Sequence, residues 1–197
     1  MRRGPSPDRG ASMIMVSMSL FVLFGTAAIA VDIGALWLDR SADQKITDSA
    51  AAAGVLDAVT TDGQAACEAA LSYVAVNSDD IGSLDVSGCA AFPTVCTSAA
   101  HTHTVSSGRY TITVTYPVLD GDPLMTSGIV GASSQPLDPT DGIPCDRVGV
   151  EMTATRESLF AQLLGFDEGS TTVHTVATAS IDDSDPPINL LVLDRKG

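Results

Sequence analysis

The chain has 197 residues, and its 10 basic and 24 acidic side chains give a formal net charge of −14. The charge is unevenly spread, because residues 1–31 carry a net charge of +2 and residues 32–197 a net charge of −16. A body this acidic repels phosphate groups, which excludes nucleic acid as a partner. The apolar content of 45% is too high for an intrinsically disordered chain, and the length suits one domain with or without an appended segment.

A long apolar segment lies near the N-terminus. Residues 11–31 form a run of 21 without any charge, after a polar, basic tail at residues 1–10. A helix of this length spans about 30 Å, the thickness of the hydrocarbon core of a bilayer. Arg2, Arg3 and Arg9 precede the run, and basic residues favour the cytoplasmic side. The pattern predicts a single-pass protein of the cell membrane, with a cytoplasmic tail and an extracytoplasmic body.

A cleaved signal peptide is the alternative interpretation of the same segment. Ala28-Ile29-Ala30 has the small-x-small form that signal peptidase recognises. The apolar core of a signal peptide is usually only about 7–15 residues long, however. The helical pattern also continues beyond Ala30. A retained anchor in the lipid bilayer is therefore favoured, and with either interpretation the body lies outside the cytoplasm.

The number and the positions of the cysteines are consistent with export of the body from the cytoplasm. Cys67, Cys89, Cys96 and Cys145 all follow the apolar segment, and an even number in an oxidising compartment predicts two disulfides. Three connectivities are possible. Cys89 and Cys96 are close enough in sequence to pair, which would join Cys67 to Cys145. The spacings match no zinc module.

The residues beyond the apolar segment alternate between helical and strand patterns. The helical spacing of apolar residues continues to about residue 60, where Asp62 and Gly63 end the helix. Residues 79–108 and 118–147 are expected to be loops. The other expected elements are a second helix at 64–77, strands at 109–116, 148–155 and 171–181, a short helix at 156–164, and a terminal apolar strand at 188–193.

These elements predict an α+β fold. Strands that are polar on one face need only one covering layer, which the helices supply. We expect a long N-terminal helix, with its first half in the membrane, packed on a small, mainly antiparallel sheet of three to four strands with one or two short helices. The expected organisation is a tail at 1–10, a transmembrane helix at 11–31, an extracytoplasmic domain at 32–181, and a linker with the terminal strand at 182–197.

Candidate residues for chemistry are few. His101 and His103 are spaced to ligate one metal from a strand, but no third ligand is near them and their segment is typical of a solvated loop. His174 is expected to be exposed on a strand, and Asp120-Gly121-Asp122 lacks the remaining ligands of a calcium loop. No nucleophile motif and no phosphate-binding motif occurs. We therefore expect no catalytic residues, no metal and no cofactor.

The N-terminal third resembles the TadE/TadG-like proteins of Flp (tight-adherence) pilus systems. The shared pattern is a basic start with Arg-Gly, an apolar span, Val-Asp-Ile-Gly, and then Arg, Gln, Asp and an alanine-rich end. The residues that match this pattern are Arg9, Gly10, Val31, Asp32, Ile33, Gly34, Arg40, Gln44, Asp48 and Gly54. Pilin-like members have a Glu five residues after a Gly cleavage point, where this chain has Met15. The TadG-like branch, which keeps its anchor, is therefore the better match.

The resemblance implies an accessory or structural role in pilus assembly, with other pilus assembly or envelope proteins as partners and no enzymatic activity. Two alternatives are a secreted or surface-anchored binding module, which would use loops or the polar face of the sheet, and an exported hydrolase whose site the sequence does not reveal.

Overall fold

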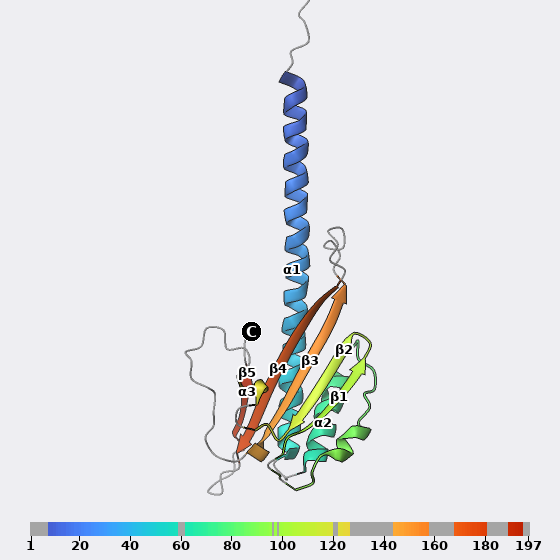
Figure 1. Cartoon of the computed structure of the whole chain (residues 1–197), viewed down its shortest axis with the longest axis vertical. Helices are drawn as coiled ribbons and strands as arrows, with labels where there is room; N and C mark the ends of the chain where they lie inside the picture. Colours follow the sequence, from blue (N-terminus) through green and yellow to red (C-terminus); the bar gives the residue numbers. More distant parts are fainter. Residues whose placement is uncertain are drawn as a thin grey trace, which may run out of the picture. The chain divides into compact units, whose positions relative to one another are not determined.

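A computed structural model describes residues 8–58, 62–95, 97, 99–119, 122–126, 144–157, 168–180 and 189–194 (Figure 1). The chain divides into two units, the first made of residues 1–38 and 157–169, the second of residues 39–156 and 170–197. Helix α1 (Asp8–Ala58) contributes to both units without a break.

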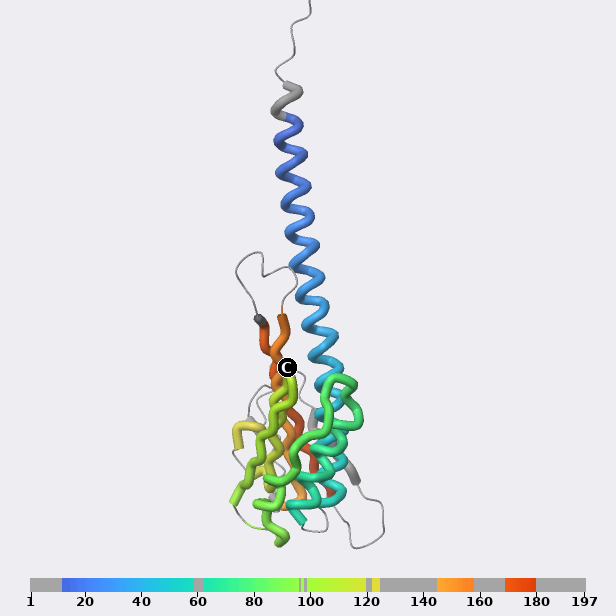
Figure 2. The backbone as a smooth tube through the Cα atoms, turned by 90° about the vertical axis from the view of Figure 1, so that its right-hand side faces the viewer, coloured from blue at the N-terminus to red at the C-terminus, as the bar shows by residue number. Residues whose placement is uncertain are grey.

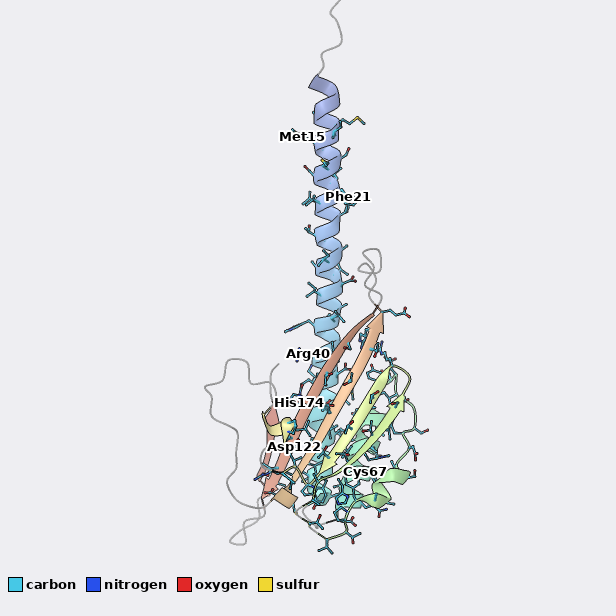
Figure 3. The ribbon with its side chains drawn as sticks, in the orientation of Figure 1. Met15, Phe21, Arg40, Cys67, Asp122 and His174 are labelled. Carbon is cyan, nitrogen blue, oxygen red and sulfur yellow. A yellow bond between two sulfur atoms is a disulfide. The ribbon has the colours of Figure 1, made fainter. Side chains whose placement is uncertain are left out.

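In the first unit, α1 is an apolar helix whose side chains are exposed from Ser12 to Ala27 and mostly exposed beyond. It is long and apolar enough to cross a membrane, and none of its most apolar stretch is buried. Figure 3 shows the Met15 and Phe21 side chains pointing away from the helix; they are 73% and 82% exposed. The hydroxyls of Ser17 and Ser19 donate hydrogen bonds to backbone carbonyls one turn earlier, at 2.8 and 2.9 Å, so these polar groups are satisfied within the helix.

The second unit contains a five-stranded sheet in the order β1-β2-β3-β4-β5 (Figure 1). The strands are β1 (His101–Ser107), β2 (Tyr110–Tyr116), β3 (Arg147–Glu157), β4 (Glu168–Ser180) and β5 (Asn189–Asp194). The pairs β1–β2, β2–β3 and β4–β5 are antiparallel, and the arrows of β3 and β4 in Figure 1 also run in opposite directions. The α+β fold expected from the sequence is confirmed.

Strand β1 corrects one expectation, because its residues were expected to form a loop. Its pairing with β2 sets Val105 opposite Ile112, and both side chains are buried. The segment holds only one strongly apolar residue, so alternation alone did not reveal the strand. It forms because Gly108, with φ of +59°, closes a tight turn into β2, where a side chain would be strained.

Helices α1 and α2 (Gly63–Asn77) cover one face of the sheet, and Figure 2 shows them together on that side. Helix α2 begins at the N-cap Asp62, whose Oδ1 accepts a hydrogen bond from the Ala65 backbone at 3.1 Å. The core therefore lies between this helical layer and the inward residues of the strands. Its fully buried members include Ala50, Val55, Ala66, Ala70, Leu71, Ile112, Val114, Val148, Val150 and Met152.

The opposite face of the sheet is largely polar. Hydroxyl side chains pair across neighbouring strands there: Thr104 with Thr113 at 3.0 Å and Thr153 with Thr172 at 3.0 Å. A small second apolar cluster lies at one end of this face. It consists of Val118, Val176 and Leu124 of the short helix α3 (Pro123–Thr126).

The disulfide pairing expected from the sequence is wrong. Cys67 of α2 is bonded to Cys89, which lies in the 3-10 turn η1 (Ser87–Ala91). The turn places Cys89 against α2, so Cys67 pairs with it and not with Cys145. Cys145, at the second 3-10 turn η2 (Pro144–Asp146), is also disulfide-bonded, and Cys96 lies outside the described residues.

The expected short helix at 156–164 lies mostly outside the described residues, and its first two residues belong to β3. The expected terminal apolar strand corresponds to β5, which pairs with β4.

Gly54 sets how closely α1 approaches α2 and β3. A Cβ atom at Gly54 would lie 2.9 Å from the backbone oxygen of Ala66 and 3.1 Å from Cγ1 of Val148. Gly54→Val is therefore expected to lower the free energy of unfolding by about 1–3 kcal/mol through overpacking. Denaturation of the full chain in detergent micelles, followed by circular dichroism, measures the change.

The control is Gly34→Val in the same helix, where an added Cβ meets nothing within 4 Å. Both substitutions put a β-branched residue into a helix, so only the packing differs. An equal effect of the two would show that the close contact at Gly54 does not matter.

Candidate functional site

The residues of the family-like pattern divide into two groups along α1. Arg9 and Gly10 lie in its first turn, and Val31, Ile33 and Gly34 lie on exposed helix in the first unit, with Val31 55% and Ile33 62% exposed. Asp32 is half-buried. The remaining members belong to the second unit, where Arg40 is partly buried and Gly54 is the close contact described above. The first group lies on the apolar part of α1 that is long enough to cross a membrane, and the second group includes residues that attach the helix to the sheet.

The attachment site consists of Gln44, Asp48 and Thr175, named here the docking triad. Gln44 Nε2 donates to Asp48 Oδ1 at 2.7 Å, one helical turn away, and to Thr175 Oγ1 of β4 at 2.8 Å. The Thr175 hydroxyl in turn donates to Asp48 Oδ1. Thr175 is fully buried, so its hydroxyl needs these partners. The triad joins α1 to β4 and fixes which side of the helix faces the sheet.

A charged cluster lies one turn earlier on α1. Asp39 Oδ2 is 2.7 Å from Arg156 at the end of β3, and Asp80 Oδ2 is 2.5 Å from Arg109 in the turn just before β2. The Arg109 guanidinium also donates to the Tyr110 hydroxyl at 2.7 Å. These groups bring α1, the segment after α2 and two strands together at one end of the sheet.

Asp43 is the buried member of this cluster. It is 3% exposed, and its Oδ2 has no hydrogen-bond partner among the residues that the structure describes. Burial raises the pKa of the Asp43 carboxyl above its ordinary value; the Arg156 charge opposes the shift, and Asp39 adds to it. The carboxylate therefore lowers the stability of the fold once it is ionised.

The histidines form no common site. The His101 ring packs against Phe92, with centroids 6.1 Å apart, and Nε2 of His103 lies 3.0 Å from the backbone oxygen of Asp85. Gly88 leaves room for this arrangement, because a Cβ there would lie 2.2 Å from the His103 ring. His174 of β4, labelled in Figure 3, was expected to be exposed and is half-buried. Its backbone carbonyl accepts a hydrogen bond from Gln44 Nε2 at 3.4 Å. Within the described part of the chain, no three His, Cys, Asp or Glu side chains are grouped to hold a metal ion.

Asp122 of the calcium-like fragment caps a helix. Its Oδ1 accepts a hydrogen bond from the Leu124 backbone at 2.9 Å. Asp120 and Gly121 lie outside the described residues.

Sequence reasoning missed four residues that organise the second unit: Thr175, Arg109, Arg156 and Arg147. Thr175 lies on the same inward face of β4 as Val173 and Ala177. This alternation is the sequence signal that could have identified Thr175 as a buried residue. Arg147 is fully buried, with its Nε 3.7 Å from Asp146 Oδ1, and nothing in the sequence distinguishes it from a surface arginine.

Comparison with models of known protein families, with curated proteins and with solved structures finds no match to this chain.

The docking triad predicts a specific loss of stability. Thr175→Val keeps the shape of the side chain and removes the hydroxyl that serves Asp48, so the free energy of unfolding should fall by about 1.5–3 kcal/mol. Thr172→Val is the matched control on the same strand, because that residue is exposed; its effect should stay within about 0.5 kcal/mol. Equal effects in chemical denaturation would contradict the role given to the triad.

Asp43 predicts a pH dependence of stability. Its pKa is higher in the folded than in the unfolded state, so stability is fully present below the unfolded pKa and falls as the pH rises through the folded pKa. Asp43→Asn removes this titration without changing the shape. The variant should therefore gain stability relative to the natural chain on going from pH 3 to pH 7.

Asp85→Asn provides a control of opposite sign. Hydrogen bonds from Ser87 lower the pKa of Asp85, so this variant should lose relative stability over the same range. Melting temperatures of the three proteins across the pH range test both signs, and parallel curves would refute the assignment for Asp43.

Proposed function

We propose that this chain is a membrane-anchored, extracytoplasmic accessory or structural protein of a Flp (Tad) type pilus assembly system. It acts by anchoring and by protein–protein contact and has no enzymatic activity. The positive-inside preference, with Arg2, Arg3 and Arg9 before the apolar segment, supports a cytoplasmic tail and an extracytoplasmic body.

The observation that carries the proposal is the continuity of α1. One unbroken helix holds both the apolar segment and the side of the core formed by Ala50, Gly54 and Ala58. Cleavage after Ala30 would cut within this element, which supports a retained anchor. A second observation gives the family-like spacing a physical reason: Gln44 and Asp48 hold the helix to β4, and Gly54 permits its close packing.

A binding module remains the second candidate. The polar face of the sheet favours it, because rows of threonine hydroxyls there are exposed on neighbouring strands, as at Thr104 and Thr111. A ligand of this face would be recognised by hydrogen bonds and not by charge.

Membrane fractionation tests the anchor. The natural chain should stay in the membrane after alkaline carbonate extraction, with its N-terminus intact or lacking only Met1. Leu20→Arg combined with Leu23→Arg should release or destabilise it, because each charge costs about 2.5–3.5 kcal/mol at the centre of a transmembrane helix. Thr102→Arg, an exposed position on β1, is the control and should leave the protein in the membrane.

The mature N-terminus, determined by mass spectrometry, separates the alternatives. A mature start at Val31 would overturn the anchor and favour the secreted binding module. A start at Ala11 would indicate a processed, pilin-like subunit. Crosslinking in cells, followed by identification of the captured proteins, tests the pilus assignment, which requires components of the pilus assembly machinery among them.

A further inference from the structure

The exposed apolar surface of α1 does not end with the charge-free segment. Beyond Val31, the side chains of Ile33, Trp37 and Leu38 are 62%, 71% and 67% exposed. These three residues are named here the Trp37 patch. Large apolar side chains with this exposure need a covering environment that the described residues do not supply.

The Trp37 patch lies on a different side of α1 from Asp32, the charged residue that interrupts the apolar stretch. Asp32 and Leu36 are four residues apart and share one side, and both are half-buried. Ile33 and Trp37 form the next row, turned by about 100°. The single charge between Ser12 and Leu38 is therefore kept apart from the exposed apolar row.

We propose that the Trp37 patch lies in the interfacial layer of the bilayer on the extracytoplasmic side, among lipid headgroups and the first acyl carbons. This inference rests on the proposed membrane anchor. The bilayer contact of α1 would then extend to Leu38, seven residues beyond the charge-free segment.

Three physical arguments favour lipid as the occupant. The helix from Ser12 to Leu38 has a length of about 40 Å, which matches the hydrocarbon core together with its interfacial regions. Tryptophan also prefers this depth, because its ring is apolar and its indole N–H needs a polar partner. The patch continues an apolar helix that is exposed on all sides from Ser12 to Ala27, which is the pattern expected for lipid and not for a one-sided protein groove.

Trp37 is the only tryptophan of the chain, so its fluorescence reports the patch directly. The full chain is reconstituted in phosphatidylcholine vesicles that contain lipids brominated either near the headgroup or deep in the acyl chain. We expect emission at shorter wavelength than in water, weak quenching by aqueous acrylamide, and quenching by the shallow bromines about twofold stronger than by the deep ones.

Two variants calibrate the measurement. Trp37→Phe with Leu20→Trp places the reporter in the middle of the apolar segment, where deep bromines should quench it most. Trp37→Phe with Leu56→Trp places it at a 45% exposed position of α1 in the second unit, where acrylamide should quench it and bromines should not.

The outcomes separate this inference from the anchor itself. If the reporter at position 20 is quenched by bromines and Trp37 is not, the anchor stands and the interfacial placement of the patch is wrong. If neither is quenched, the anchor is wrong as well. Shielding of Trp37 from acrylamide without any bromine quenching would mean that a protein surface covers the patch, which also overturns the proposal.

Discussion

The second unit depends on how α1 is held against the sheet. The side of α1 that faces the core carries small residues, Ala50, Ala51, Gly54 and Ala58, which allow close approach but bury little apolar area each. Gly54 favours one orientation of the helix, because a Cβ at that contact would lie 2.9 Å from the backbone oxygen of Ala66. The docking triad reinforces this orientation, because a rotation by one residue position would carry Gln44 and Asp48 away from Thr175 and leave a buried hydroxyl without partners.

The charged cluster also joins α1 to the strands, but its polar groups are less completely satisfied than those of the docking triad. Asp39 and Arg156 are paired, and so are Asp80 and Arg109, yet the buried Asp43 has an oxygen that accepts no hydrogen bond from the described residues. Pairs at a partly exposed edge contribute little to stability. The second unit therefore gains orientation from its polar groups and most of its stability from apolar burial.

The sequence predicted the elements whose patterns are strong. Strict alternation in Tyr110–Tyr116 revealed β2, and the Asp62-Gly63 break separated α1 from α2. Strand β1 was missed because His101 and His103 occupy inward positions that apolar residues usually fill. The disulfide partner of Cys67 was missed because proximity in sequence favoured Cys89 with Cys96, whereas the 3-10 turn brings Cys89 to α2. Contacts of this kind depend on the tertiary structure and cannot be recognised from the local sequence.

The site was predictable only in part, for the same reason. Gln44, Asp48 and Gly54 were recognised because their spacing resembles the family pattern. The residues that they contact, on β4, α2 and β3, lie far away in sequence.

The continuity of α1 has a practical consequence for any water-soluble fragment. The exposed large apolar residues of α1 in the first unit end at Leu38, and the first residue of the docking triad is Gln44. A fragment that begins at Asp39 loses the exposed apolar surface of the first unit and retains both the Asp39–Arg156 pair and the docking triad. A fragment that begins at Ala50 discards the triad and leaves Thr175 buried without those partners.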